Sequence, residues 1–134
     1  MEKFDDSRLH ENLTFLGQMH SAPSKTIETF EAPFGIGVVV ISSYEMTAFC
    51  PKTHQPDYYS IWVRYIPNKK CIESKAFKLY LMSYREEGHF IESLSKIILD
   101  DLVNQTEPAW MQVEIEMNPR GGITINAKSE YKNE

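Results

Sequence analysis

The alternation of apolar and polar positions predicts strands in the middle and near the end of the chain. Over residues 58–66 every second side chain is apolar or aromatic, which is the period of a strand with one buried face. The predicted buried face holds Tyr59, Ile61, Val63 and Tyr65. Residues 109–117 alternate in the same way, with Met111, Val113, Ile115 and Met117 on one side. After a turn at "NPRGG", residues 123–127 are predicted to form a final strand.

Two further strands are predicted nearer the N-terminus. Residues 26–32 and 36–43 are rich in β-branched side chains and flank a turn at Pro33–Gly35. Residues 1–24 are polar and end in "SAPSK", so we expect an N-terminal arm that is only partly ordered. No linker or internal repeat divides residues 25–134, which are therefore predicted to form a single domain.

Between these strands the period changes to that of two helices. In residues 73–88 the apolar positions recur at helical spacing, Ser74 is a suitable N-cap, and Gly88 is a suitable stop. A second helix is predicted over residues 89–105, before Pro108. The apolar stripes of the two helices are Phe77, Tyr80, Leu81 and Tyr84, and Ile91, Leu94, Ile98 and Leu102. Strands grouped apart from helices favour an α+β fold with an antiparallel sheet.

Composition and charge narrow the possible functions. With 134 residues, 42% hydrophobic and 25% charged, the chain has the composition of a soluble globular domain. The formal net charge of −5 argues against a nucleic-acid-binding surface. No apolar run approaches the roughly 20 residues that span a membrane. A polar N-terminus and only two cysteines indicate a cytoplasmic protein with reduced thiols, with no membrane partner and no direct nucleic-acid partner.

The stretch "AFCPKTHQPDYY" contains the first candidate for chemistry. Cys50 lies where a β-rich segment meets a proline-bounded loop, and a partly exposed thiolate there could act as a nucleophile. The carboxyl of Asp57 could reach chemistry at the sulfur if the loop doubles back. The spacing alone favours a half-buried cysteine with Asp57 capping a turn. It also allows a Cys50–His54 pair as in cysteine hydrolases, although no local signature of those enzymes is present.

Lysines at a predicted helix start suggest anion binding. Lys75 and Lys78 are about one turn apart near Ser74, where free backbone N–H groups and two ammonium groups suit a phosphate. A solvated helix face explains the same lysines. Neither the G-x-G-x-x-G fingerprint nor a P-loop occurs, so a nucleotide would be held in another way. The histidines and cysteines lack metal-ligand spacing, and we expect no metal site.

Glu92 and Arg120 each have an ordinary and a functional interpretation. Glu92 lies four residues before Lys96, so an exposed ion pair between them is the ordinary one. The functional one is a carboxylate that accepts paired N–H bonds from a purine-like edge. Arg120 in "PRGG" is either a turn residue or an anion contact.

Three stretches of the chain resemble a known enzyme family. They are "CPKTHQPDYYSIWVRYIPN", "CIESKAFKLYLMSYREEG" and "MNPRGGITI". The family is that of the NADPH-dependent 7-cyano-7-deazaguanine reductases of queuosine biosynthesis, in their short single-domain form. The resemblance covers roughly residues 44–131 and makes the nucleophile interpretation of Cys50 the favoured one. It implies a tunnelling fold, an antiparallel sheet backed by two helices, that assembles into rings with active sites between subunits. Two stacked pentamers, a decamer, are the implied assembly.

The resemblance also implies a reaction and a set of site residues. The nitrile of 7-cyano-7-deazaguanine is reduced to the amine of 7-aminomethyl-7-deazaguanine with two equivalents of NADPH. By resemblance, Cys50 adds to the nitrile carbon to give a thioimide and Asp57 donates the proton, for which we expect a poorly solvated carboxyl. The implied substrate contacts are Ile72, Glu73, Ser74, Ile91 and Glu92. The implied NADPH contacts are Lys75, Lys78, Tyr80 and Arg120.

The chain departs from these relatives in ways that keep two other interpretations open. Relatives usually have His where this chain has Ile91 and Gly where it has His54, and some have Cys in place of Leu94. One alternative is a relative that adds ammonia to a nitrile already in tRNA and makes an amidine. The intact "ESKAFKLY" and the acidic charge place it second. The other is a ring protein that binds a deazaguanine without turnover, which only Ile91 supports.

Overall fold

The computed structural model describes residues 4, 6, 9, 13–15 and 22–133. In chain order its elements are β1 (Thr29–Glu31), β2 (Val39–Phe49), β3 (Pro56–Ile66), β4 (Lys70–Ile72), α1 (Ser74–Met82), α2 (Ile91–Thr106), β5 (Trp110–Met117) and β6 (Asn126–Lys132). Each pairing between these strands is antiparallel. The predicted α+β class with an antiparallel sheet is confirmed.

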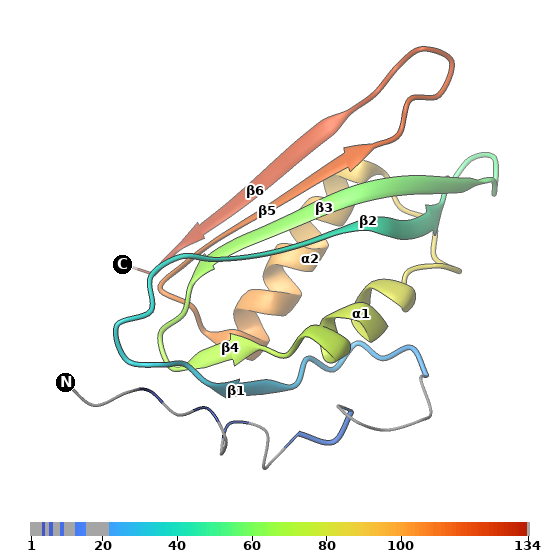
Figure 1. Ribbon diagram of the computed structural model, residues 1–134. Helices are drawn as coiled ribbons and strands as arrows, with labels where there is room; N and C mark the ends of the chain where they lie inside the picture. The colour runs from blue at the N-terminus through green and yellow to red at the C-terminus, as the bar shows by residue number, and fades with distance from the viewer. Residues whose placement is uncertain (1–3, 5, 7–8, 10–12, 16–21, 134) are drawn as a thin grey trace.

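The strands form two sheets, and the helices cover one face of the larger sheet. The main sheet has the order β2-β3-β5-β6, and β1 pairs with β4 in a separate two-stranded sheet. Both helices lie on the same side of the main sheet (Figure 1), and α2 packs against β5 and β6 while α1 packs against β2. The strands β2 and β6 are therefore the edges of the main sheet within one chain.

The hydrophobic core fills the space between the main sheet and the helices. Along β3 the inward-facing side chains are at most 1% exposed, as the alternation predicts. These are Tyr59, Ile61, Val63 and Tyr65. The predicted stripe of α2 packs into the same core cluster. Both predictions are confirmed because burial requires apolar side chains at the positions that share one face of an element.

The turn at Pro33–Gly35 does not make a hairpin of β1 and β2. Instead β1 pairs with β4, with Phe30 opposite Cys71. Only three residues form β4, too few to show as a periodic pattern, and the sequence analysis did not predict it. β2 extends past the predicted residue 43 to Phe49 through a bulge.

A long loop joins β5 to β6 at one end of the sheet. β6 begins at Asn126 rather than at residue 123 because Gly121 and Gly122 form a turn, with left-handed φ values of 58° and 80°. Arg120 enters this turn, and its N–H donates to the Ile123 carbonyl at 2.9 Å. The loop thereby holds Arg120 at this end of the sheet.

The N-cap of α1 is Glu73 and not the predicted Ser74. The Glu73 carboxylate accepts hydrogen bonds from the N–H of Lys75 at 2.9 Å and of Ala76 at 2.8 Å. A side-chain cap of this kind stabilises a helix by about 1 kcal/mol. Glu73 is only 4% exposed, so its carboxylate is already used by the fold.

The boundaries of both helices differ from the predictions. α1 ends at Met82, six residues before the predicted stop at Gly88. α2 runs from Ile91 to Thr106, where residues 89–105 were predicted, and its C-cap Glu107 takes a left-handed φ of 50°. In the part of the chain that the structure describes, neither helix has the length and apolar character needed to cross a bilayer.

The predicted arm, residues 1–24, lies mostly outside the described residues. Of its described part, the N–H groups of Thr14 and Phe15 both donate to the Glu28 carboxylate at 2.9 Å. Ser24, at the end of the arm, donates its N–H to a carbonyl of α1 at 3.2 Å. These contacts join the described part of the arm to the domain.

Candidate active site

Cys50 begins the loop of residues 50–55 that joins β2 to β3, here called the thiol loop. The Cys50 N–H donates to the Gln55 carbonyl at 2.9 Å, which closes the loop. His54 takes a left-handed φ of 57°, and its N–H donates to the Cys50 carbonyl at 3.0 Å. The loop doubles back, as the nucleophile interpretation requires, and leaves Cys50 as a half-buried free thiol.

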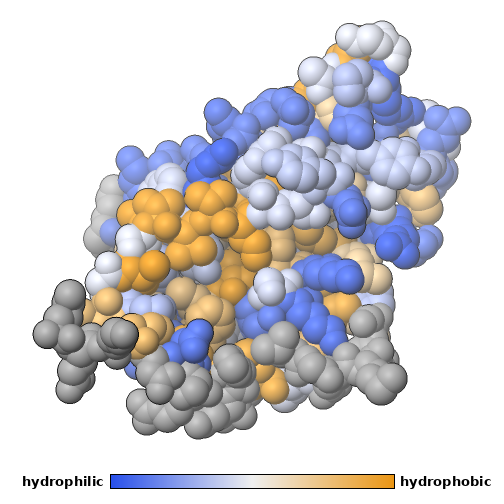
Figure 2. Space-filling view, in the orientation of Figure 1, coloured by the Kyte–Doolittle hydropathy of each residue, from blue (hydrophilic) through white to orange (hydrophobic). Residues whose placement is uncertain are grey.

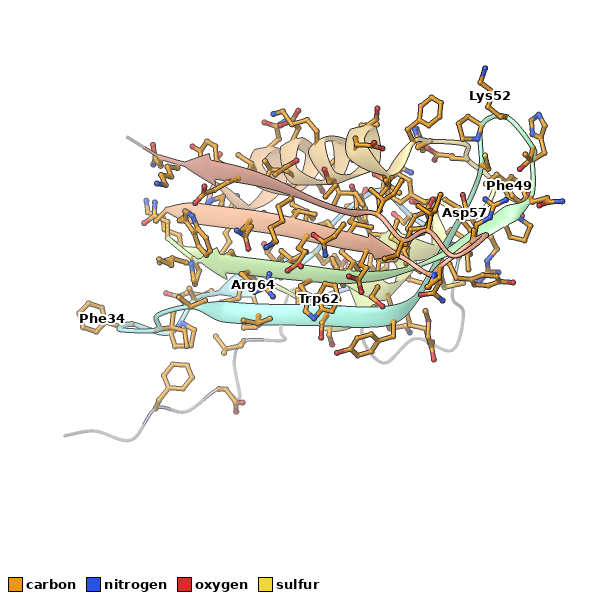
Figure 3. The ribbon with its side chains drawn as sticks, turned by 90° about the horizontal axis from the view of Figure 1, so that it is seen from above. Phe34, Phe49, Lys52, Asp57, Trp62 and Arg64 are labelled. Carbon is orange, nitrogen blue, oxygen red and sulfur yellow. The ribbon has the colours of Figure 1, made fainter. Side chains whose placement is uncertain are left out.

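Asp57 lies at the end of the sheet next to the thiol loop. It is opposite Ala48 in the β2–β3 pair, in the buried row of β3, and is 4% exposed. The prediction of a poorly solvated carboxyl is confirmed. The Tyr59 hydroxyl donates to the Asp57 carboxylate at 3.4 Å, and burial raises the pKa of Tyr59, so this donor stays protonated. Figure 3 shows Phe49 and Asp57 at this end of the sheet, with Lys52 on the loop beyond them.

Arg120 reaches the same end of the sheet from the β5–β6 loop. Its guanidinium forms an ion pair with Asp57, donating from Nη1 to Oδ1. Its Nη2 donates to the side-chain oxygen of Gln55 at 3.3 Å. The guanidinium is also close enough to the sulfur of Cys50 to lower the pKa of that thiol. Arg120 is thus situated between the two candidate catalytic residues.

The thiol loop favours the thiolate form of Cys50. Hydrogen bonds from the Thr53 side chain, then from the Thr53 and Lys52 backbone, lower the pKa of Cys50 to about 7, and Arg120 adds to the effect. A considerable fraction of this thiol is therefore ionised at neutral pH, and the thiolate is the nucleophilic form. The other thiol differs, because burial raises the pKa of Cys71.

The thiol loop packs against the segment that leads into α2. The Phe49 N–H donates to the Glu87 carbonyl at 2.8 Å, and the His89 N–H donates to the Phe49 carbonyl at 3.3 Å. A side chain at Gly88 would meet the Cα of Pro51 at 3.2 Å, which is tighter than an ordinary contact. Glycine at this position serves the close approach of two backbone segments and does not stop α1.

The first turn of α2 therefore lies beside the thiol loop. Glu92 is exposed there, and Lys96 pairs with Asp100 at 2.6 Å, so the ordinary interpretation of Glu92 as the ion-pair partner of Lys96 is wrong. In the described part of the chain no side-chain hydrogen bond or ion pair occupies the Glu92 carboxylate. Ile91 is 4% exposed and packs in the core, so its side chain does not line an open site.

The segment Ile72–Ser74 lies near the opposite end of β3. The Ile72 N–H donates to the Tyr65 hydroxyl at 2.9 Å, and Tyr65 is next to the last residue of β3, whereas Asp57 is next to the first. At about 3.3 Å per residue, this stretch of strand is about 26 Å long. One chain therefore does not bring the predicted substrate contacts together. With most of the other predicted site residues, they divide into a thiol-end group (Cys50, Asp57, Ile91, Glu92, Arg120) and an α1-start group (Ile72, Glu73, Ser74, Lys75, Lys78).

The lysines predicted to bind a cofactor lie on α1. Ser74, Lys78 and Arg85 line a groove of about 500 Å³ between α1 and β2. The ammonium group of Lys78 and the guanidinium group of Arg85 suit phosphate groups. The residues present therefore fit the anionic part of a nucleotide.

Tyr80 does not fit the predicted cofactor contact. Its side chain is 0% exposed, and its hydroxyl is 2.7 Å from the Tyr84 hydroxyl and 2.8 Å from a carboxylate oxygen of Asp101. It faces the core because it belongs to the apolar stripe of α1. A fully buried ring has no surface to offer a cofactor, and the role of Tyr80 is structural.

Comparison with known proteins identifies the family. A family model described as "QueF-like protein" matches residues 56–134. A relative from Thiobacillus denitrificans, named "NADPH-dependent 7-cyano-7-deazaguanine reductase", is 45% identical over 119 residues, which cover 85% of this chain and 84% of the relative. The chain belongs to the family of QueF-like proteins. A relative of the same name from Halorhodospira halophila is 44% identical over 84% of this QueF-like chain and 98% of its own length.

A solved structure agrees with the QueF-like fold. It is titled "Crystal structure of the archaeosine synthase QueF-Like in the apo form" and superposes with a TM-score of 0.68. The match covers 73% of this chain and 96% of that one at 20% identity. At this level of identity the likeness concerns the fold alone.

In this QueF-like chain, His89 does not take the place of the histidine that the resemblance implies next to Glu92. Its Nε2 lies 2.8 Å from a carboxylate oxygen of Glu87. Its ring also packs edge-on against Tyr84, with 6.0 Å between the ring centres. His89 therefore belongs to the support of the thiol loop and not to an open pocket.

Sequence reasoning missed two residues of this QueF-like site. Phe90 is the N-cap of α2, directly before Ile91 and Glu92, and is 56% exposed. An exposed aromatic ring beside a carboxylate suits a planar heterocycle, and its place before a candidate ligand was the available signal. Gln55 contacts Arg120 through its side chain. Nothing in the local sequence indicates that contact.

Proposed function

We propose that the protein reduces 7-cyano-7-deazaguanine to 7-aminomethyl-7-deazaguanine with NADPH, through a thioimide on Cys50. Relatives that are 42–45% identical carry the name of this activity. The structural observation that supports the proposal most is the pairing of a thiol whose pKa is lowered to about 7 with the buried carboxyl of Asp57. Both groups lie at one end of the sheet, where Arg120 contacts each of them.

The first step forms a carbon–sulfur bond. The Cys50 thiolate adds to the nitrile carbon, one electron pair of the triple bond moves to the nitrogen, and Asp57 gives that nitrogen a proton. The product is a thioimide, whose C=N bond accepts hydride far more readily than a nitrile does. Burial of Asp57 keeps bulk water away from the proton that it donates.

The remaining steps require Cys50 to leave again. NADPH, when bound, supplies two hydrides for the four-electron reduction of a nitrile to an amine. Cys50 departs as a thiolate after the carbon has received the first of them, and the low thiol pKa makes it a good leaving group. Asp57 stays next to the nitrogen, which needs further protons to become an amine.

Residues at the start of α2 suit the substrate. The exposed carboxylate of Glu92 can accept two N–H bonds from the amide and amine edge of a deazaguanine. The exposed ring of Phe90 can stack on the same heterocycle. On the cofactor side, Lys75 and Lys78 fit the phosphates of NADPH, and the groove beside Lys78 gives them room.

A site that uses both groups of residues requires two chains. Ile72 of the α1-start group is separated from Asp57 of the thiol-end group by about 26 Å along β3, so one substrate does not reach both residues in a single chain. An exposed edge strand is a surface that another chain can pair with. β2 is such an edge, and Ile36, Val38 and Val40 are exposed on it or just before it. Figure 2 shows this apolar surface over the first half of β2.

We infer a closed ring in which the β2 edge of one chain meets the β6 edge of the next. Repetition of one such heterologous contact closes a ring when the rotation allows it. A decamer of two stacked pentamers is the form that the resemblance implies. The α1-start group of one chain would then complete the site at the thiol end of its neighbour.

The test of the reductase is a mixture of protein, 7-cyano-7-deazaguanine and NADPH. We expect the absorbance of the reduced cofactor to fall by two equivalents for each nitrile reduced. An amidine-forming enzyme would consume no NADPH and would require ammonia. A binding protein would leave both reactants unchanged, so the absence of NADPH consumption contradicts the reductase.

Mixed rings test the two-chain site. A Cys50→Ala chain and a Lys75→Ala/Lys78→Ala chain are each expected to be nearly inactive at NADPH concentrations near the wild-type KM. When they are refolded together in equal amounts, about a quarter of the sites should combine an intact thiol with intact lysines of the neighbour. We therefore expect about a quarter of the wild-type activity, measured as NADPH consumption.

A matched control distinguishes one-chain from two-chain sites. A chain with all three changes, refolded with an equal amount of wild-type chain, should give about a quarter of the activity for two-chain sites and about half for one-chain sites. If the Cys50→Ala chain and the Lys75→Ala/Lys78→Ala chain form mixed rings but restore no activity, each site lies within one chain.

A further inference from the structure

The side chain of Arg120 connects three groups that belong to two different segments. Nη1 donates to the buried carboxylate of Asp57, and Nη2 donates to the Gln55 side chain at 3.3 Å. The guanidinium is also close enough to the sulfur of Cys50 to lower the pKa of that thiol. Gln55 and Cys50 are the two ends of the thiol loop, closed by the backbone bond between them at 2.9 Å. Arg120 therefore joins the Gln55 end of this loop to the acid of the adjacent strand and lies near Cys50.

The same position gives Arg120 an electrostatic role. A cation close to a thiol favours the ionised form of that thiol. A guanidinium keeps its charge throughout the working pH range, and its hydrogen bond to Asp57 raises the pKa of Arg120 further. Arg120 therefore brings a permanent positive charge to the end of the sheet that holds Cys50 and Asp57.

We propose that Arg120 is a positioning residue for the addition of Cys50 to the nitrile, which holds Asp57 beside the thiol loop and favours the thiolate form of Cys50. The proposal rests on the proposed function for its substrate, but its claim about the thiol concerns the free protein. It differs from the cofactor contact that the resemblance implies for Arg120, because the addition step precedes any use of NADPH.

Several other ionisable groups surround the thiol. They are Asp57 and Tyr59 of β3, Lys52 and His54 of the thiol loop, and Glu87 and His89 of the segment behind it. Tyr59 stays protonated, since burial raises its pKa. Glu87 and His89 pair with each other at 2.8 Å. Arg120 is the cation that bonds the buried carboxylate and lies near the sulfur.

The first experiment titrates the thiol in the free protein. The ultraviolet absorbance of the thiolate should rise with pH around a midpoint of about 7 in the wild type. In Arg120→Met the midpoint should move up measurably but by less than about one pH unit, because loss of a nearby cation disfavours the thiolate while the hydrogen bonds from Thr53 and Lys52 remain. Arg120→Lys should stay close to the wild type. Arg64→Met is the matched control, since Arg64 pairs with Glu114 at 2.6 Å away from the thiol loop.

The second experiment measures addition without NADPH. With 7-cyano-7-deazaguanine at neutral pH, Arg120→Met should form the adduct about 10- to 100-fold more slowly than the wild type, by intact mass. The KM for NADPH should not change. In an Asp57→Asn background, Arg120→Met should slow adduct formation by less than about threefold, because the effects of two residues that act through one another are not additive.

Two results would overturn the proposal. One is an unchanged thiol midpoint in Arg120→Met. The other is a wild-type rate of adduct formation combined with a raised KM for NADPH, which would make Arg120 a cofactor residue. If the wild-type protein itself forms no adduct, the proposed function fails, and the titration of the free protein still decides the role of Arg120.

Discussion

Cys50→Ala should abolish nitrile reduction, with NADPH consumption at least about 10³-fold below the wild type. Alanine has no atom that can bond to the nitrile carbon, so the C=N intermediate is not formed and hydride has no acceptor. Intact mass should show no gain of the ligand on the variant, whereas the wild type gains it without NADPH. The side chain is half-buried in a loop, so the change should leave the core intact.

The second cysteine provides the matched control. Cys71 is 5% exposed, belongs to β4, and has its pKa raised by burial, so it is the unreactive thiol of the pair. Cys71→Ala should still form the adduct and still consume NADPH. Adduct formation by Cys50→Ala, at any rate near that of the wild type, would show that Cys50 is not the nucleophile.

Asp57→Asn should slow adduct formation by about 10²-fold, the usual contribution of a positioned proton donor. Asparagine keeps the size of the side chain and can still accept a bond from Arg120, but it has no carboxyl proton to give to the nitrile nitrogen. The measurement is the rate of mass gain without NADPH, under conditions in which the wild type is complete within minutes to hours. Burial of the site should prevent water from taking over the role fully.

The control for this change is Asp100→Asn. Asp100 is an exposed aspartate of α2 that pairs with Lys96 at 2.6 Å, so the same chemical change there removes an ordinary surface ion pair. It should leave adduct formation within about twofold of the wild type. A wild-type rate in Asp57→Asn would mean that the proton comes from another group or from solvent.

The elements around the core could be predicted from periodicity. The buried row of β3 and the apolar stripe of α2 are found where the spacing of apolar residues places them. Local sequence signals for helix caps and short strands predicted the structure less well. Both Ser74 and Glu73 can cap a helix, and Glu73 acts as the cap because of where the chain leaves β4. That strand has only three residues and forms by pairing with β1, far earlier in the chain.

For the candidate site, too, part could be predicted from the sequence and part depended on contacts between distant segments. The residues Cys50 and Asp57 could be selected from the sequence, but their spacing alone favoured an ordinary turn, and the family resemblance changed that interpretation. Arg120 was assigned to a cofactor, yet it contacts Asp57, which is 63 positions away in the chain. Tyr80 was assigned to the cofactor as well, and its burial in the core excludes that contact.

The order of amino acids is enough to establish the α+β class, the buried faces and the residues that mark the family, because these depend on local backbone geometry and on side-chain chemistry. The folded chain was needed to show that Cys50, Asp57 and Arg120 meet, and that Ile72–Ser74 lie far from them. Contacts between distant segments depend on strand register and on how loops close, and both follow from the packing of the whole domain.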